Sequence, residues 1–168
     1  MEIHAAPRVL LDELDAASIP YEVMPHRHVD TALEEAEVLG VDAFRVAKTI
    51  VLTTPEGFVR AVVPACERLC LDKVRDILGT SQVEVASEDV LAGLYPEYEP
   101  GAVPPFPGTS GDSVIVDGRL DKTALVVIAA GTHEESVRLR TGDLVSLTHA
   151  LLCDLCKDRP RVVRNVRR

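Results

Sequence analysis

Lys48 is the most conspicuous charged residue in the chain, because it interrupts the apolar run "RVAKTIVLTT". Such a run is typical of a β-strand, in which alternate residues share one face. Lys48 should therefore lie in line with Val46, Ile50 and Leu52. It could be a lysine whose stem lies along apolar surface while its ammonium reaches water. It could instead project into a pocket and bind a ligand as a cation. The sequence alone favours the first interpretation.

The segment "YEPGAVPPFPG", residues 98–108, contains four prolines and two glycines. Each proline fixes φ and lacks an N–H group, whereas Gly101 allows the backbone to approach a ligand closely. A stiff loop loses little conformational entropy on binding, so this one is suited to form the wall of a small-molecule site. The alternative is that the loop is only a rigid connector.

Three histidines are candidate functional residues. His133 in "AAGTHEES" follows an apolar strand and is either a solvated turn residue or a hydrogen-bonding partner for a substrate amine or hydroxyl. His26 and His28 in "MPHRHVD" are close enough to suggest a metal site. No third ligand has a motif spacing to them, so we expect no histidine metal site.

The four cysteines form two closely spaced pairs. Cys66 and Cys70 have the spacing C-x3-C, and Cys153 and Cys156 have the spacing C-x2-C. Two such pairs could build a structural zinc site if the fold brought them together. Small buried free cysteines are common, however, and disulfides are rare in the cytoplasm. We expect free thiols rather than bound zinc.

Length and charge indicate one domain, which we place at residues 1–156, followed by a basic tail at residues 157–168. The chain has 168 residues and a net charge of −9. The tail carries six Lys or Arg and one Asp, a net +5, so the rest carries −14. An acidic body argues against a broad phosphate-binding surface.

The longest apolar run, "ALVVIAA", is too short for a membrane span, and the acidic N-terminus does not resemble a signal peptide. We therefore expect a cytoplasmic protein that does not bind membranes.

The elements that must position these residues follow from periodicity and from turn signals. Helical spacing or capping residues predict helices at 7–19, 30–40, 71–79, 87–94 and 141–152. Apolar β-rich runs predict strands at 21–26, 46–54, 58–65, 83–86, 113–117, 123–130 and 136–140. The expected helix caps are Asp30 or Thr31, Gly40, Ser87 and Thr141. The turn "PEG" predicts a hairpin. The order favours an α+β fold with a mixed, mostly antiparallel sheet and helices packed around it, rather than a doubly wound sheet.

Taken in order, several of these segments resemble the YbaK/EbsC family, whose members are relatives of the editing domain of bacterial prolyl-tRNA synthetases. The resemblance runs from about residue 7 to residue 155. It includes "TALEEAEVLGV", "RVAKTIVL", "AVVPACERLCLDKVRDILG", "YEPGAVPPFPG", "VIVD", "VVIAAGTHEESVRL" and "GDL". No segment is specific alone, but their order and spacing together are.

This resemblance implies an aminoacyl-tRNA deacylase with the editing-domain fold, which needs no metal or cofactor. The family's catalytic lysine falls on Lys48 and its loop glycine on Gly101. In the family, the ribose hydroxyl of the terminal adenosine assists the attacking water. The implied substrate-binding residues are His133, Thr49, His26, Ala102, Pro104, Phe106 and Gly131. The implied partner is the acceptor end of aminoacyl-tRNA, with a synthetase as a further candidate.

The residues that mark specificity within the family point in different directions. His133 matches the alanine-editing members, which tend to have Asn where this chain has Thr49. The cysteine-editing members have Tyr at the position of His26 and Arg at that of His133. Pro107 departs from the family's usual loop end. We expect a trans-editing hydrolase that removes alanine or another small amino acid from tRNA for proline. The alternative is a non-catalytic aminoacyl- or nucleotide-binding module with a regulatory role.

Overall fold

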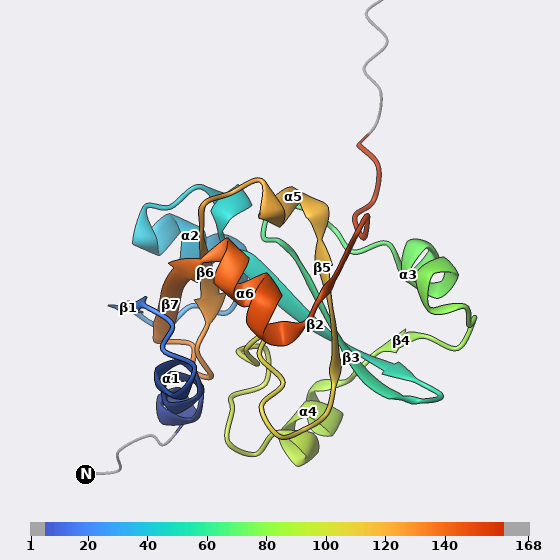
Figure 1. Ribbon diagram of the computed structural model, residues 1–168, viewed down its shortest axis with the longest axis horizontal. Coiled ribbons are helices and arrows are strands. Elements are labelled where there is room, and N and C mark those ends of the chain that lie inside the picture. Colours follow the sequence, from blue (N-terminus) through green and yellow to red (C-terminus); the bar gives the residue numbers. More distant parts are fainter. Residues whose placement is uncertain (1–5, 160–168) are drawn as a thin grey trace, which may run out of the picture.

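The computed structural model describes residues 6–159 and shows a mixed α+β fold with two sheets (Figure 1). One sheet has the strand order β1-β7-β6 and the other has the order β4-β2-β3-β5-β8. The helices are α1 (Ala6–Ala16), α2 (Ala32–Leu39), the 3-10 helix η1 (Ala43–Arg45), α3 (Leu71–Leu78), α4 (Glu88–Leu94), α5 (Gly118–Asp121) and α6 (Thr141–Thr148). The strands are β1 (Tyr21–Pro25), β2 (Ala47–Thr54), β3 (Gly57–Pro64), β4 (Glu84–Val85), β5 (Ser113–Asp117), β6 (Leu125–Ala129), β7 (Glu135–Arg140) and β8 (Leu151–Cys153).

The local signals for α2 and for the hairpin are confirmed. The Thr31 side chain accepts a hydrogen bond from the Glu34 N–H, and Gly40 ends the helix in the left-handed conformation at φ 65°. The "PEG" turn joins β2 and β3 into an antiparallel ladder from Ala47 opposite Pro64 to Thr54 opposite Gly57. This hairpin carries Lys48, so its register fixes where the lysine lies.

The predicted helix at 141–152 is too long. Helix α6 ends at Thr148, because His149 adopts the left-handed conformation at φ 51°. The chain then enters β8, which pairs in parallel with β5. The expected capping role of Thr141 is also wrong. Arg140 occupies the N-cap position without a capping side-chain bond, and the Thr141 hydroxyl lies 3.2 Å from that of Thr123.

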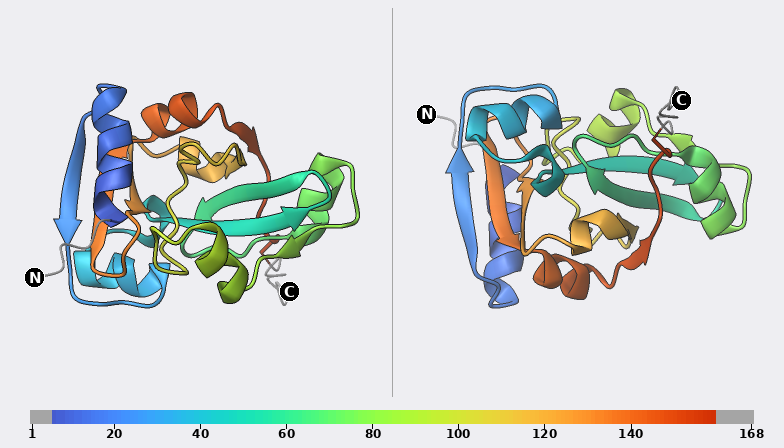
Figure 2. Two further views of the ribbon diagram at one scale, coloured as in Figure 1. Left: turned by 90° about the horizontal axis from the view of Figure 1, so that it is seen from below. Right: turned by 90° about the horizontal axis from the view of Figure 1, so that it is seen from above.

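The two sheets divide the molecule into two parts. The antiparallel sheet β1-β7-β6 lies at one end next to α1, and the β2–β3 hairpin extends away from it toward α3 (Figure 2). The larger sheet is mixed, because β2, β3 and β4 pair antiparallel whereas β5 pairs in parallel with β3 and β8. The expected mixture of strand directions is present, but in two sheets. No helix within residues 6–159 is long and apolar enough to cross a membrane.

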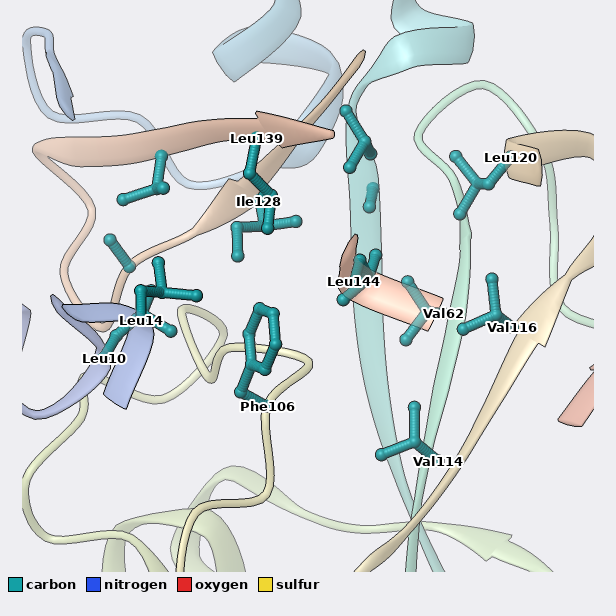
Figure 3. Packing of buried hydrophobic residues seen from close by; sticks show 14 residues of the cluster. Leu10, Leu14, Val62, Phe106, Val114, Val116, Leu120, Ile128, Leu139 and Leu144 are labelled. Carbon is teal, nitrogen blue, oxygen red and sulfur yellow. The ribbon is translucent and has the colours of Figure 1, made fainter. Parts of the chain in front are cut away.

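The largest core cluster joins α1 to both sheets. Phe106 is 1% exposed and reaches from its loop toward Leu14 and Ile128 (Figure 3). Helix α1 contributes Leu10 and Leu14, and the strands contribute mainly valines. Burial of an aromatic ring of this size contributes about 1.5–3 kcal/mol. Phe106 therefore holds the proline-rich loop against the core.

Candidate active site

A cavity of about 440 Å³ lies between α2, the start of β2, the proline-rich loop and the start of β7. Its volume lies within the range of small-molecule sites. Six of the residues expected from the sequence to contact substrate line it: His26, Lys48, Thr49, Gly101, Ala102 and His133. The fold thus brings together residues that are more than one hundred positions apart.

Lys48 lies near the start of β2, on the face that it shares with Ile50 and Leu52, as alternation predicts. Its Nζ donates a hydrogen bond to the Glu67 carbonyl at 3.1 Å. An ammonium has three N–H donors, so two remain for a ligand. Burial lowers the pKa of the Lys48 ammonium below its usual value. Lys48 is therefore a fixed, half-buried cation at the cavity wall.

Thr49 belongs to a stretch of β2 with one open edge. The Val51 carbonyl accepts a hydrogen bond from the Ala86 N–H on the side away from β3. Backbone groups two residues apart in a strand point to the same side, so the N–H and C=O of Thr49 also point away from β3. The ladder to β4 begins only at Leu52. The Thr49 hydroxyl is buried and has no hydrogen-bond partner among residues 6–159. Thr49 thus offers polar groups at the cavity wall.

Gly101 and His133 are in close contact. Gly101 has φ +86°, and a Cβ built there would lie 3.4 Å from Cε1 of the His133 ring. A side chain at this position would strain the backbone and crowd the ring. His133 Nε2 donates to the Pro100 carbonyl at 2.9 Å, since a carbonyl only accepts. In the neutral ring, Nδ1 is then a hydrogen-bond acceptor.

The loop that carries Gly101 is held from behind by Arg60, which is 1% exposed. Arg60 Nη1 donates to the carbonyls of Pro104 and Phe106, at 2.8 and 2.7 Å. Arg60 Nε donates to Asp112 at 3.1 Å, and the guanidinium lies over the Tyr95 ring. A planar guanidinium with five donors suits this clamp. The loop is therefore fixed by the side chain of a neighbouring strand as well as by its prolines.

Three of the expected substrate-binding residues do not line the cavity. The Phe106 ring packs in the core, and the carbonyls of Pro104 and Phe106 accept hydrogen bonds from Arg60. The cavity wall formed by the loop therefore consists of Gly101 and Ala102. The Gly131 N–H donates to the Ala102 carbonyl, and its own carbonyl accepts from the Glu99 N–H. Gly131 thus ties the loop to the segment before His133. The structure places all three as supports of the loop.

His26 takes part in a chain of hydrogen bonds in the cavity wall. Its Nε2 lies 2.8 Å from the Ser136 hydroxyl, which lies 2.5 Å from Glu35 Oε1. Ser136 and Glu35 also line the cavity, and sequence reasoning missed both. The sequence does carry a signal for Glu35, because helical spacing puts it on one face of α2 with the apolar residues Ala32 and Leu39. An isolated serine in an amphipathic strand carries no comparable signal.

The cysteines are free thiols in the structure. Burial raises the pKa of Cys156 to about 12, so this thiol stays protonated at neutral pH. No group of three or more His, Cys, Asp or Glu within residues 6–159 is arranged to hold a metal ion. The expectation of a zinc-free protein remains a prediction, which metal analysis of the purified protein can test.

Comparison with known proteins places this site in a defined family. Residues 26–147 match the aminoacyl-tRNA editing domain family. The chain therefore belongs to this family. A search of curated proteins found no match.

Solved structures show the same fold at low sequence identity. A proposed trans-editing enzyme for prolyl tRNA synthetase has 22% identity and a TM-score of 0.82, over 94% of this chain and 100% of that one. The hypothetical protein APE2540 has 22% identity and a TM-score of 0.81, over 89% of this chain and 99% of that one. A scaffold from computational epitope grafting has 23% identity and a TM-score of 0.82, over 92% and 98%. These similarities confirm the expected fold.

Proposed function

We propose that this protein is an aminoacyl-tRNA deacylase that acts in trans and removes alanine or another small amino acid from tRNA for proline. The observation that carries the proposal is the joint presence of Lys48, Thr49, Gly101 and His133 around one cavity in an editing-domain fold. On this proposal the partner is the acceptor end of charged tRNA in the cytoplasm, and a synthetase is a further candidate partner.

The reaction needs only modest assistance, because an aminoacyl ester is already reactive. Water attacks the ester carbonyl, and the resulting tetrahedral oxyanion collapses to release the ribose hydroxyl. Backbone N–H groups near Gly101 are the proposed oxyanion donors. Loss of one such donor in an enzyme costs on the order of 10²–10³ in rate. The two remaining N–H groups of Lys48 are proposed to bind a phosphate or ribose oxygen of the tRNA end.

Selectivity on this proposal comes from the size and polarity of the cavity. Ala47, Ala102 and Val51 supply apolar wall, and the loop is held rigidly behind Gly101. A small pocket excludes large side chains by steric clash but separates small ones poorly, since one methylene is worth about 1–3 kcal/mol. The polar groups of Thr49 and His133 are then available for the amino and hydroxyl groups of the substrate.

Release of amino acid from charged tRNA without any synthetase tests the proposal. The purified protein should release alanine from alanyl-tRNA for proline faster than the spontaneous rate. Gly101→Ala should lose most of this activity, because the substitution strains the backbone at φ +86°. Binding of charged tRNA without release would contradict the proposal and favour the non-catalytic binding module.

A further inference from the structure

Three polar residues from separate elements form a continuous hydrogen-bonded chain in the cavity wall. His26 follows β1, Ser136 lies in β7 and Glu35 lies in α2. Ser136 is 0% exposed and Glu35 is 8% exposed, whereas His26 is only half-buried. His26 Nδ1 also lies 2.7 Å from the Arg27 carbonyl. Buried polar groups that are this well paired define a specific protonation pattern.

The number of protons in the chain follows from its geometry. A carbonyl only accepts, so His26 Nδ1 must carry a proton for Arg27. The two remaining contacts, Nε2 to Oγ and Oγ to Oε1, each need one proton. Ser136 supplies one of them. The other belongs either to Glu35, with a neutral His26, or to His26, with an ionised Glu35.

Both arrangements leave Glu35 Oε2 as a hydrogen-bond acceptor, because the shared proton lies on the Oε1 side. Oε2 has no hydrogen-bond partner among residues 6–159 and keeps contact with solvent. Glu35 lines the cavity, so this oxygen is open to a ligand there.

Burial of the carboxyl group favours the arrangement in which Glu35 carries the proton. Burial raises the pKa of Glu35, while the Ser136 hydrogen bond and the charges of His26 and His133 act in the opposite direction. The other titratable groups that line the cavity are Lys48 on β2, Asp30 after β1 and Glu135 on β7. A protonated Glu35 avoids the desolvation cost of a carboxylate that is buried without an ion-pair partner among residues 6–159.

We propose that Glu35 binds the α-ammonium group of the aminoacyl substrate through Oε2 and becomes ionised as it does so, with His26 taking up the proton. This inference rests on the proposed deacylase function and names the group that recognises the amine. The Oε1–H bond of Glu35 breaks and its proton passes to Ser136 Oγ. The hydroxyl proton of Ser136 passes to His26 Nε2. No proton enters or leaves the protein, and the new positive charge lies beyond Ser136, away from the bound ammonium.

The protonation of His26 provides a test that does not depend on activity. The probe is L-alaninamide at pH 7, where its amine is largely charged, and the control ligand is N-acetyl-L-alaninamide, which has no charge. NMR of the imidazole nitrogens should show His26 becoming an imidazolium with alaninamide only. Glu35→Gln should abolish this response, because the amide can donate to Ser136 and keep His26 neutral. Glu37→Gln, on the exposed side of the same helix, should preserve it.

Equal responses to both ligands, or no response in the wild-type protein, would overturn the inference whether or not the variants fold.

Deacylation supplies the second test. Alanyl-tRNA should be cleaved roughly 10- to 100-fold faster than its N-acetyl form, because one charged hydrogen bond to the amine corresponds to a ratio of about that size. Glu35→Gln should remove most of that ratio. Equal cleavage of both esters would refute amine recognition but leave the deacylase intact. A His26 response without cleavage of either ester would support the amine site and refute the proposed reaction.

Discussion

Lys48 combines a charge with a position at the start of a buried strand. Its ammonium is held by one carbonyl and lines the cavity, so it is available to a ligand without being freely mobile. Of the two interpretations of this residue, a lysine that simply reaches water fits less well with its hydrogen bond to Glu67. The catalytic assignment of Lys48 remains a prediction.

Lys48→Ala should lower kcat/KM for deacylation by roughly 10- to 100-fold, which is the rate factor that corresponds to the free energy of one charged hydrogen bond. The folded protein already disfavours the ammonium, because burial lowers its pKa. The substitution should therefore leave the melting temperature nearly unchanged. If the charged form of Lys48 supports deacylation, its lowered pKa should make the deacylation rate fall at a lower alkaline pH than a lysine of ordinary pKa would. A folded Ala variant with near-normal turnover would contradict the assignment.

His133 should act on selectivity more than on rate. Its ring contacts Gly101, and Nδ1 is left as an acceptor for a substrate amine or hydroxyl. Because the family resemblance aligns His133 with the alanine-editing members, we expect alanine to be removed faster than cysteine, with serine also accepted. His133→Ala should reduce the ratio of kcat/KM for alanine over cysteine more than it reduces the best rate. Cysteine removed well ahead of alanine by the wild-type protein would refute the branch assignment.

At the scale of elements, the proline-rich loop depends on a buried ion pair. Arg60 and Asp112 have side chains that are 1% and 8% exposed. Arg60→Met should destabilise the protein by about 3–5 kcal/mol, because it leaves the buried Asp112 carboxylate without its cation. If the variant is folded at low temperature, its kcat/KM should also fall as the loop loses its anchor. Denaturant unfolding and deacylation measure the two effects.

Arg138→Met is the matched control for this prediction. Arg138 pairs with Glu22 on the surface, where both side chains are more than a third exposed. Loss of an exposed ion pair costs at most about 1 kcal/mol. An Arg60 variant as stable as the Arg138 variant would show that the loop does not depend on its anchor.

The sequence predicts those elements whose ends carry specific residues. Thr31 and Gly40 bound α2, and the "PEG" turn sets the hairpin register. The end of α6 carries no such signal, because His149 takes a left-handed conformation that is usual for glycine. The apolar residues that follow extend the helical pattern, so β8 could not be separated from the helix.

The site was predictable only where single residues carry the information. Lys48 and Gly101 are unusual in their local sequence, which indicates them as candidates, and both line the cavity. Arg60 reaches carbonyls 44 and 46 positions away, and the Glu35–Ser136 contact spans 101 positions. Tertiary contacts of this kind have no local pattern. The prolines indicate that the loop is stiff, but they do not indicate that Arg60 holds it from the side opposite the cavity, because that contact is also tertiary.

For the molecule as a whole, the proposed function requires an acidic body to bind a polyanion, tRNA. The basic tail lies mostly outside the described residues, but Arg159 pairs with the buried Glu67 at 2.6 Å. Removal of residues 160–168 takes away four arginines and keeps this pair. It should weaken tRNA binding and reduce the slope of log K against log salt by up to about 3, since counterion release scales with phosphate contacts. An unchanged slope, measured beside the full chain, would exclude a role in tRNA capture.

The proposed function requires the cavity to hydrolyse a mischarged ester and to spare the cognate one. The most direct measurement is single-turnover deacylation of one tRNA for proline, charged in parallel with alanine or with proline. Alanine should be released much faster than proline, because the pyrrolidine ring is bulkier and its amine offers one fewer N–H. Release of proline as fast as alanine, or of neither above the spontaneous rate, would contradict the proposed function.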